Sequence, residues 1–242
     1  MTSNKYTIRN HHKPTVEFLN YFLKGDTMTM IRNMDIECGL CGETSSQPVL
    51  FSTNSMGYAD LDLRPPAMQR DTMNTWVVEC PHCRYVAENL EDKPKIGRDF
   101  TESEAYRTCE GNEFKSRMSS IFYRRYLICR SEKDPEGEFH NVLHCAWACD
   151  DCEDDLATDM RRLACELLEG ILQTKIDENL NLLRADLLRR SGQFERVIEE
   201  YGNIAPEDKL LNDITRFQVE KAYLKDDACY TVKDVIDEFG GQ

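Results

Sequence analysis

Apolar residues change their spacing along this chain near residue 100. From about Glu102 onward they recur every three or four positions, which is the period of an amphipathic α-helix. The first run contains Phe114, Met118, Ile121, Phe122 and Tyr126. The later runs cover Leu156 to Ile171, Leu180 to Arg190, Phe194 to Tyr201 and Glu207 to Leu224. Short loops between such runs predict antiparallel neighbours, so we expect residues 99–242 to form an α-helical bundle or a short solenoid.

Residues 34–92 carry short β-branched and aromatic runs instead of a helical period. Pro48 to Phe51 and Thr75 to Glu79 are predicted strands. Ser55 to Asp71 lies between them and contains Gly57 and two adjacent prolines, so we expect a long irregular loop there. Glu91 to Gly97 has the composition of a linker. The pattern therefore predicts a small β domain at 34–98 with a long inserted loop.

Residues 1–33 are predicted to form an N-terminal extension that is partly disordered, with poor order at residues 1–10. Within it, Thr15 to Leu23 has apolar positions compatible with a short helix. Met34 stands just before the first cysteine pair, so a shorter product beginning there is an alternative. Three segments are thus expected: 1–33, 34–98 and 99–242.

Composition and charge narrow the class of protein. The chain has 242 residues, 40% of them apolar, with no run of eighteen apolar residues and no apparent signal peptide, so no membrane partner is expected. Its eleven cysteines then predict reduced thiols and a cytoplasmic location. Of the net charge of −14, residues 99–242 carry −13, from nineteen basic and thirty-two acidic residues. Such a surface repels phosphate backbones, which disfavours nucleic acid as a partner.

Two matched cysteine pairs are the clearest chemical feature. Cys38 and Cys41 form one C-x2-C pair, and Cys80 and Cys83 form the other, thirty-eight residues further on. Two such turns facing each other make a tetrahedral four-thiolate site. Four thiolates leave no open coordination position, so the expected cofactor is one structural Zn2+ per chain. No catalytic residue is predicted at this site.

Other interpretations of these four cysteines remain open. Iron in a rubredoxin-like site uses the same ligands, and unliganded buried thiols or a redox pair would use the same spacing. Zinc is favoured because both cysteine pairs are present and the βαβ context of a redox motif is absent. His82, inside the second turn, is expected to be exposed and not a ligand. The expected fold is α+β: a small β zinc ribbon with rubredoxin-like turns, followed by an all-α domain.

A second group of metal-binding residue types lies between His140 and Cys152. Cys145, Cys149 and Cys152 have the C-x3-C-x2-C spacing of iron–sulfur clusters in radical enzymes, and His140 and His144 could join them around a second zinc. The radical enzymes need a large α/β barrel, which this pattern does not predict. The three cysteines also share one helical face, and free cysteine is often buried. We therefore expect a packed helix face, with a second metal as the alternative.

The most unusual polar stretch runs from Asp60 to Arg70. Asp60 and Asp62 stand two positions apart, with Arg64 and Arg70 nearby. They are compatible with a cation site or a recognition loop. We favour a local ion-pair network that holds the long loop.

Two resemblances carry further expectations. Residues 184–201 resemble the middle of a tetratricopeptide repeat, with Gly192 at the turn between helices and Phe194, Val197 and Tyr201 at packing positions. One unit is recognisable, so the helical domain is expected to be similar to this repeat class. The early tryptophan and leucine–glycine signature of the repeat is missing.

The order of features also resembles a bacterial family of uncharacterised zinc-ribbon proteins, domain of unknown function 2225. The shared motifs span residues 38–85: the two cysteine pairs, the loop at Asp60 and Asp62, and Tyr85. Arg84 stands where that family usually has glycine, which would make the second turn less regular. The resemblance implies the fold and the metal, and it brings no assigned activity.

These observations favour a protein-interaction adaptor or scaffold over an enzyme. A metal-stabilised ribbon would support helices whose surface binds another protein. The alternative is a metal-dependent or redox enzyme that uses His140–Cys152 or Asp60–Arg70. A nucleic-acid-binding ribbon is disfavoured, because residues 31–98 have a net charge of −3.

Overall fold

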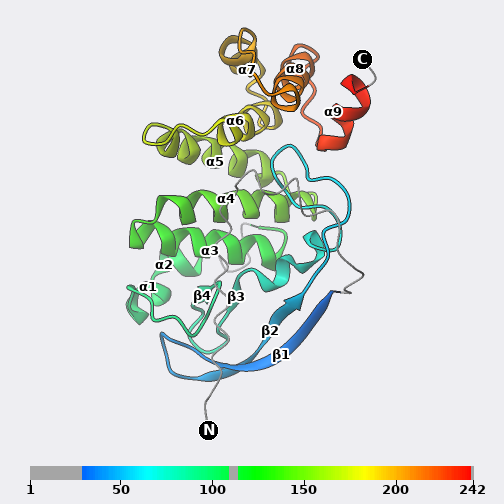
Figure 1. Cartoon of the computed structure of the whole chain (residues 1–242). Coiled ribbons are helices and arrows are strands. Elements are labelled where there is room, and N and C mark those ends of the chain that lie inside the picture. Colours follow the sequence, from blue (N-terminus) through cyan, green and yellow to red (C-terminus); the bar gives the residue numbers. More distant parts are fainter. Residues whose placement is uncertain (1–28, 109–113, 241–242) are drawn as a thin grey trace.

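The computed structural model describes residues 29–108 and 114–240, which form a mixed α+β fold with strands near the N-terminus and helices beyond (Figure 1). The strands are β1 (Met30–Glu37), β2 (Thr44–Ser52), β3 (Val78–Glu79) and β4 (Val86–Ala87). The short helices are η2 (Arg70–Thr75), α1 (Arg98–Glu102) and α2 (Glu104–Arg107). The longer ones are α3 (Arg117–Glu132), α4 (Pro135–Asp150), α5 (Leu156–Leu172), α6 (Glu178–Arg190), α7 (Phe194–Tyr201), α8 (Lys209–Tyr223) and α9 (Val232–Phe239). The predicted N-terminal helix, the poor order expected at residues 1–10, and Cys109 lie outside the described residues.

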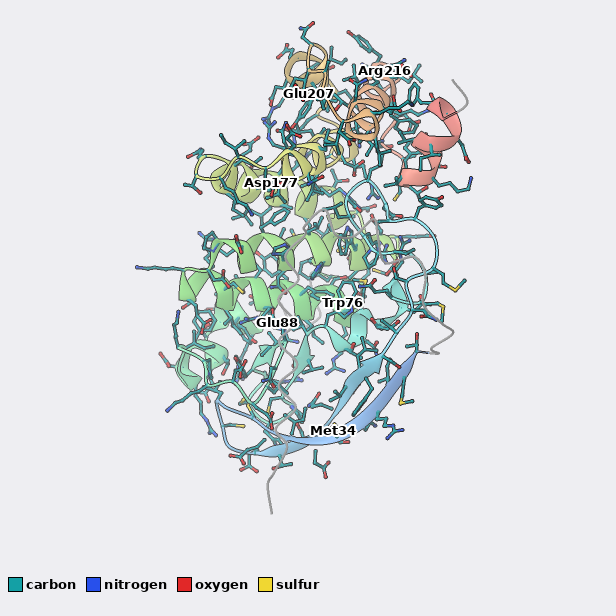
Figure 2. The ribbon with its side chains drawn as sticks, viewed as in Figure 1. Met34, Trp76, Glu88, Asp177, Glu207 and Arg216 are labelled. Carbon is teal, nitrogen blue, oxygen red and sulfur yellow. The ribbon has the colours of Figure 1, made fainter. Side chains whose placement is uncertain are left out.

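An antiparallel hairpin forms one side of the molecule. β1 pairs with β2 so that Ile31 lies opposite Leu50 and Ile36 opposite Ser45. The predicted strand at 48–51 is confirmed as part of β2. β1 begins at Met30, four residues before the expected start of the β domain, and the labelled Met34 lies on this strand (Figure 2).

The predicted strand Thr75 to Glu79 is wrong in its first half. Residues 70–75 form the 3-10 helix η2, and β3 contains Val78 and Glu79 alone. The hydroxyl of Thr72 donates to the carbonyl of Gln69 at 2.7 Å, and that of Thr75 donates to the carbonyl of Thr72 at the same distance. These local bonds compete with strand pairing and favour a tight turn.

Helices α3, α4, α5 and α6 stack in sequence order, each against the next, and α7, α8 and α9 continue beyond α6 (Figure 1). The predicted run from Leu156 is confirmed as α5, and the next three as α6, α7 and α8. Gly192 separates α6 from α7 with a φ of 76°, the left-handed conformation that ends helices. Phe114 lies ahead of α3 and not within it. None of the helices in the described ranges is both long enough and apolar enough to cross a membrane.

The hydrophobic core crosses the expected boundary at residue 98. Val78, Val86 and Leu90 belong to the same buried cluster as Phe122 and Leu143 of the stacked helices. A smaller cluster lies around α8 and α9 and includes one residue of the long loop; its buried members are Leu61, Leu182, Ile214, Phe217, Val235 and Phe239. The loop after β2, drawn in cyan, runs beside the stacked helices toward α9 (Figure 1). This loop therefore connects the β region to the helices α3–α6 and to the helices α8 and α9 beyond them.

Candidate metal centre

Two turns of the same design present the four cysteines. Cys38 and Cys41 lie where β1 turns into β2, and Cys80 and Cys83 lie between β3 and β4. In the first turn, the amide of Gly42 donates to the carbonyl of Cys38 at 2.7 Å. In the second, residue 84 donates in the same way to the carbonyl of Cys80 at 2.9 Å. In both turns, the amide of the first cysteine donates to the carbonyl five residues later.

The residue after each pair has left-handed backbone geometry. Gly42 has a φ of 77° and Arg84 a φ of 66°. The expected irregularity of the second turn is therefore not found, because Arg84 adopts the conformation that a glycine would take. A non-glycine residue in this region is held there at a cost of about 1–2 kcal/mol. The two turns thus share one backbone conformation.

The four sulfur atoms converge on one point. All four Sγ atoms lie within 4.8 Å of one another, and the Cys38–Cys83 and Cys41–Cys80 pairs are each 3.7 Å apart. A tetrahedral zinc site with Zn–S bonds of about 2.3 Å has sulfur–sulfur edges of about 3.8 Å. A disulfide would need about 2.0 Å, and all four cysteines are free. The predicted group is thus assembled in the structure, and its geometry fits a tetrahedral metal ion.

The thiols of the two turns differ in their burial. Cys38 and Cys80 are buried, whereas Cys41 and Cys83 are partly exposed. Burial raises the pKa of the Cys80 and Cys83 thiols. Burial acts in the same direction on Cys41, but hydrogen bonds from Glu43 and the other thiols outweigh it and lower that pKa. A bound cation would stabilise four thiolates together, since metal coordination deprotonates cysteine.

The first turn is held by contacts with the segment that follows β4 and with the first residue of α1. The amide of Gly39 donates to the carbonyl of Leu90 at 2.7 Å. A side-chain carbon on Gly39 would come within 2.5 Å of the carbonyl oxygen of Asp92, so glycine is required by this close approach. Arg98 donates to the carbonyl of Cys41 at 3.3 Å. These contacts fix the first turn from outside the cysteine motif.

Glu79, beside the second turn, organises a group of arginines. Its carboxylate accepts from Arg124 at 2.8 Å, from Arg117 at 2.7 Å and from Arg84 at 3.2 Å. Burial raises the pKa of Glu79, but the hydrogen bonds from Arg124 and Arg117 outweigh burial and hold that pKa below its usual range. Three guanidinium groups therefore gather on the carboxylate of the residue that directly precedes Cys80.

The His140–Cys152 group does not come together as a metal site. Cys145 and Cys149 are buried on α4, as predicted for a packed helix face, and Cys152 lies beyond the end of that helix. The thiol of Cys152 donates to the carbonyl of Ala148 at 3.4 Å, and His140 Nδ1 lies 2.8 Å from the carbonyl of Glu136. In residues 29–108 and 114–240, the four cysteines of the two turns form the one group of at least three ligand atoms close enough for a metal.

His144 lies within an aromatic cluster instead. Its ring is 5.1 Å from Trp76, 5.3 Å from Phe122 and 4.9 Å from Trp147, measured between ring centroids. Trp76 joins this cluster from just after η2, and the labelled side chain lies against the stacked helices (Figure 2). These edge and tilted contacts are typical of aromatic packing. His144 is therefore explained by the core.

The Asp60–Arg70 loop takes part in an ion-pair network, but the network is less local than the sequence favoured, because Arg64 pairs with Asp151 and Asp62 with Arg190. Asp60 pairs with Arg70 at 2.8 Å. Asp62 is fully buried and accepts from the indole of Trp147 at 2.8 Å and from Arg190 at 2.7 Å. The Asp62 partners on α4 and α6 are not apparent from the sequence, because they lie 85 and 128 positions away.

Asp150 is a second hub of this network that sequence reasoning missed. Its carboxylate accepts from Arg161 at 2.9 Å and from Arg190 at 3.0 Å. Burial raises the pKa of Asp150, but Arg161 and Arg190 outweigh burial and hold that pKa below its usual range. Arg190 thus joins Asp62 of the loop to Asp150 of α4. The network can hold the loop on the helices, and its acidic groups already have cationic partners.

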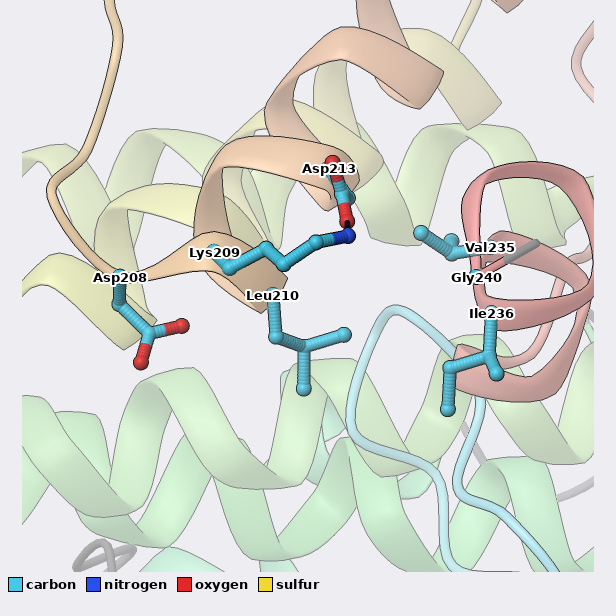
Figure 3. Close-up of a pocket in the computed structure, with 7 residues that line it drawn as sticks. All are labelled: Asp208, Lys209, Leu210, Asp213, Val235, Ile236 and Gly240. Atoms are coloured by element: carbon cyan, nitrogen blue, oxygen red, sulfur yellow. Dashed lines mark hydrogen bonds and ion pairs between the residues drawn. The ribbon is translucent and has the colours of Figure 1, made fainter. Parts of the chain in front are cut away.

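A pocket of about 340 Å³ lies on the C-terminal helices, far along the chain from the four clustered cysteines (Figure 3). Leu210, Val235 and Ile236 provide its apolar wall, and Lys209 pairs with Asp213 at its edge at 2.9 Å. It contains none of the predicted site residues.

No family model matches the chain, and neither the curated proteins nor the solved structures contain a match.

Proposed function

We propose that this chain is a cytoplasmic protein-interaction scaffold stabilised by one structural zinc ion. The observation that supports it is the convergence of four cysteine sulfurs with 3.7 Å edges between the two turns. Full thiolate coordination leaves no position for substrate, so the metal would hold the fold and not perform catalysis. We also propose that the chain is related to the uncharacterised zinc-ribbon family that its sequence resembles.

The scaffold part of the proposal is supported by the helical stack and its exposed apolar side chains. Tyr223 and Leu224, at the end of α8, are 67% and 72% exposed. Stacked helices present extended surfaces that bind peptides or helices. In this proposal, α6 and α7 are the two helices that resemble a tetratricopeptide repeat. A partner protein would bind this helical region.

Metal analysis of the purified chain tests the zinc site. We expect about one zinc per chain and no iron, and we expect Cys80→Ser to lose the metal while Cys152→Ser keeps it. Two metals per chain would refute the single site, and absorbance typical of iron–thiolate bonding would refute zinc. Equal metal content in both variants would refute the four-cysteine site.

Affinity capture from the native cell tests the scaffold role. The wild-type chain and a Tyr223→Ser/Leu224→Ser variant would be used as parallel baits, with Lys225→Ser as the control at an adjacent position. A protein that is retained by the wild type and the control but lost from the double variant would support a helical docking surface. Identical capture by all three, or recovery of nucleic acid alone, would contradict it.

A further inference from the structure

The backbone of the long loop pairs with the chain just before α9. The amide of Leu61 donates to the carbonyl of Tyr230 at 2.8 Å, and the amide of Val232 donates to the carbonyl of Ala59 at 2.9 Å. Asp60 and Thr231 form an antiparallel bridge between these bonds. We call residues 59–64 the clasp. It joins two parts of the chain that are separated by about 170 residues.

Side chains of the clasp enter two different parts of the helical stack. Leu61 is 6% exposed and belongs to the small core around α8 and α9. Asp62 is fully buried and is held by Trp147 of α4 and Arg190 of α6. The clasp therefore spans from the middle of the stack to its C-terminal end.

The metal-binding turns bracket the clasp on both sides. Thr53 Oγ1, before the clasp at the end of β2, lies 3.3 Å from the carbonyl of Met68, which follows the clasp. This contact brings the chain back toward the second turn. Beyond the clasp, η2 buries Thr72 and Met73 and leads directly to β3. Gln47 of β2 donates to the carbonyl of Glu79 at 3.0 Å, which ties the two sides together next to Cys80.

We propose that the clasp couples metal binding at the four cysteines to the docking of α8 and α9. The inference rests on the proposed zinc site. A metal bound by both turns closes the thirty-eight-residue segment that contains the clasp. Closing a chain segment at one point reduces the entropy that is lost when the same segment is fixed at another. Metal binding and clasp docking thus favour each other.

Thermodynamic reciprocity gives this proposal a direct test. If zinc strengthens clasp docking by some factor, clasp docking strengthens zinc binding by that same factor, and a variant with an undocked clasp must lose it. Couplings between sites are typically about 5- to 150-fold. Zinc affinity would be measured on the full chain by competition with a chromophoric chelator. We expect Leu61→Ala to weaken zinc binding within this range. Met56→Ala is the matched control, because Met56 lies in the same loop but outside the clasp and is 66% exposed.

Amide hydrogen exchange of the wild type, with and without zinc, provides the second measurement. We expect zinc removal to increase exchange at residues 230–232 and in α9, while α5 stays protected. Unchanged protection of α9, or equal loss in α5, would overturn the coupling, and so would equal zinc affinity in Leu61→Ala and the wild type. A wild-type chain that binds no zinc would overturn the proposed metal site and the coupling together.

Discussion

The indole N–H of Trp147 donates a 2.8 Å hydrogen bond to the carboxylate of Asp62, and both side chains are buried. Trp147 belongs to α4 and Asp62 to the loop between the cysteine pairs. The bond thus connects the segment that carries the candidate metal site to the centre of the helical stack. Arg190 approaches the same oxygen at 2.7 Å, so the carboxylate has both a neutral and a charged donor.

Replacement of Asp62 by alanine should destabilise the fold strongly. The substitution leaves Arg190, whose side chain is 8% exposed, without one of its two carboxylate partners. Breaking a buried ion pair by removal of one partner typically costs about 3–5 kcal/mol. Urea unfolding of the variant and the wild type would measure the difference in free energy.

Asp159→Ala is the matched control for Asp62→Ala. Asp159 pairs with Arg162 at 3.4 Å, and both side chains are more than half exposed. Exposed pairs contribute about 0–1 kcal/mol, so this variant should unfold close to the wild type. Similar losses in both variants would show that the buried network holds the loop no better than a surface pair does.

Replacement of Gly39 by alanine should disrupt the first turn. The new Cβ would lie 2.5 Å from the carbonyl oxygen of Asp92 and 2.9 Å from that of Glu91, and both are backbone atoms that cannot rotate away. We expect weaker metal binding and a loss of at least about 1–3 kcal/mol, the usual cost of overpacking. Metal titration and thermal unfolding would measure the two effects.

Gly170→Ala makes the same change at another glycine, and here we expect stability to rise instead of fall. Gly170 lies in α5, and nothing stands within 4 Å of the position of a new Cβ. Alanine is preferred to glycine within a helix by about 1 kcal/mol, so this variant should be slightly more stable than the wild type. If Gly39→Ala behaved in the same way, the close approach at the first turn would not be a constraint.

Much of this organisation could be predicted because its causes are local. The C-x2-C spacing is the one that a tetrahedral four-thiolate site requires, and the helical period of α5 is imposed by one buried face. α9 was missed although Val232, Val235 and Phe239 have helical spacing and Thr231 begins a capping box with Asp234. In contrast, no local pattern pairs Asp62 with Arg190, which lies 128 positions away.

Two replacements of Arg84 in the second turn should differ in stability, and the direction of the difference tests the backbone conformation. Arg84 has a φ of 66°, a conformation that glycine adopts without strain. Arg84→Gly and Arg84→Ala both remove the 3.2 Å ion pair with Glu79, but alanine keeps the strain. We therefore expect the glycine variant to be more stable than the alanine variant by about 1–2 kcal/mol.

The Arg84 pair of variants would be compared by denaturant unfolding in the presence of zinc. Their difference is informative because every contact of the arginine side chain is lost in both. Greater stability of the alanine variant would mean that the backbone at residue 84 does not hold the left-handed conformation in solution.

The pH dependence of Asp150→Asn should reveal the ionic part of the loop network. The arginines lower the pKa of Asp150 in the folded chain, so its stabilising effect is fully present above the pKa of the unfolded carboxyl, about 3.9. The effect is lost as the pH falls through the folded pKa. Near pH 6 we expect the wild type to be more stable than Asp150→Asn by about 1.5–3 kcal/mol, the range for hydrogen bonds to charged groups. This advantage should shrink steadily below about pH 4.

Urea unfolding of the wild type and Asp150→Asn at a series of pH values would measure this difference. Because acid would also remove a metal from cysteine thiolates, both chains would be measured in the metal-free state, with a chelator present at every pH. Asp159→Asn serves as the exposed control and should show a small difference at every pH. A wild-type advantage that stayed constant or grew as the pH fell would mean that Asp150 acts through packing and not through its charge, and the network would then hold the loop by shape alone.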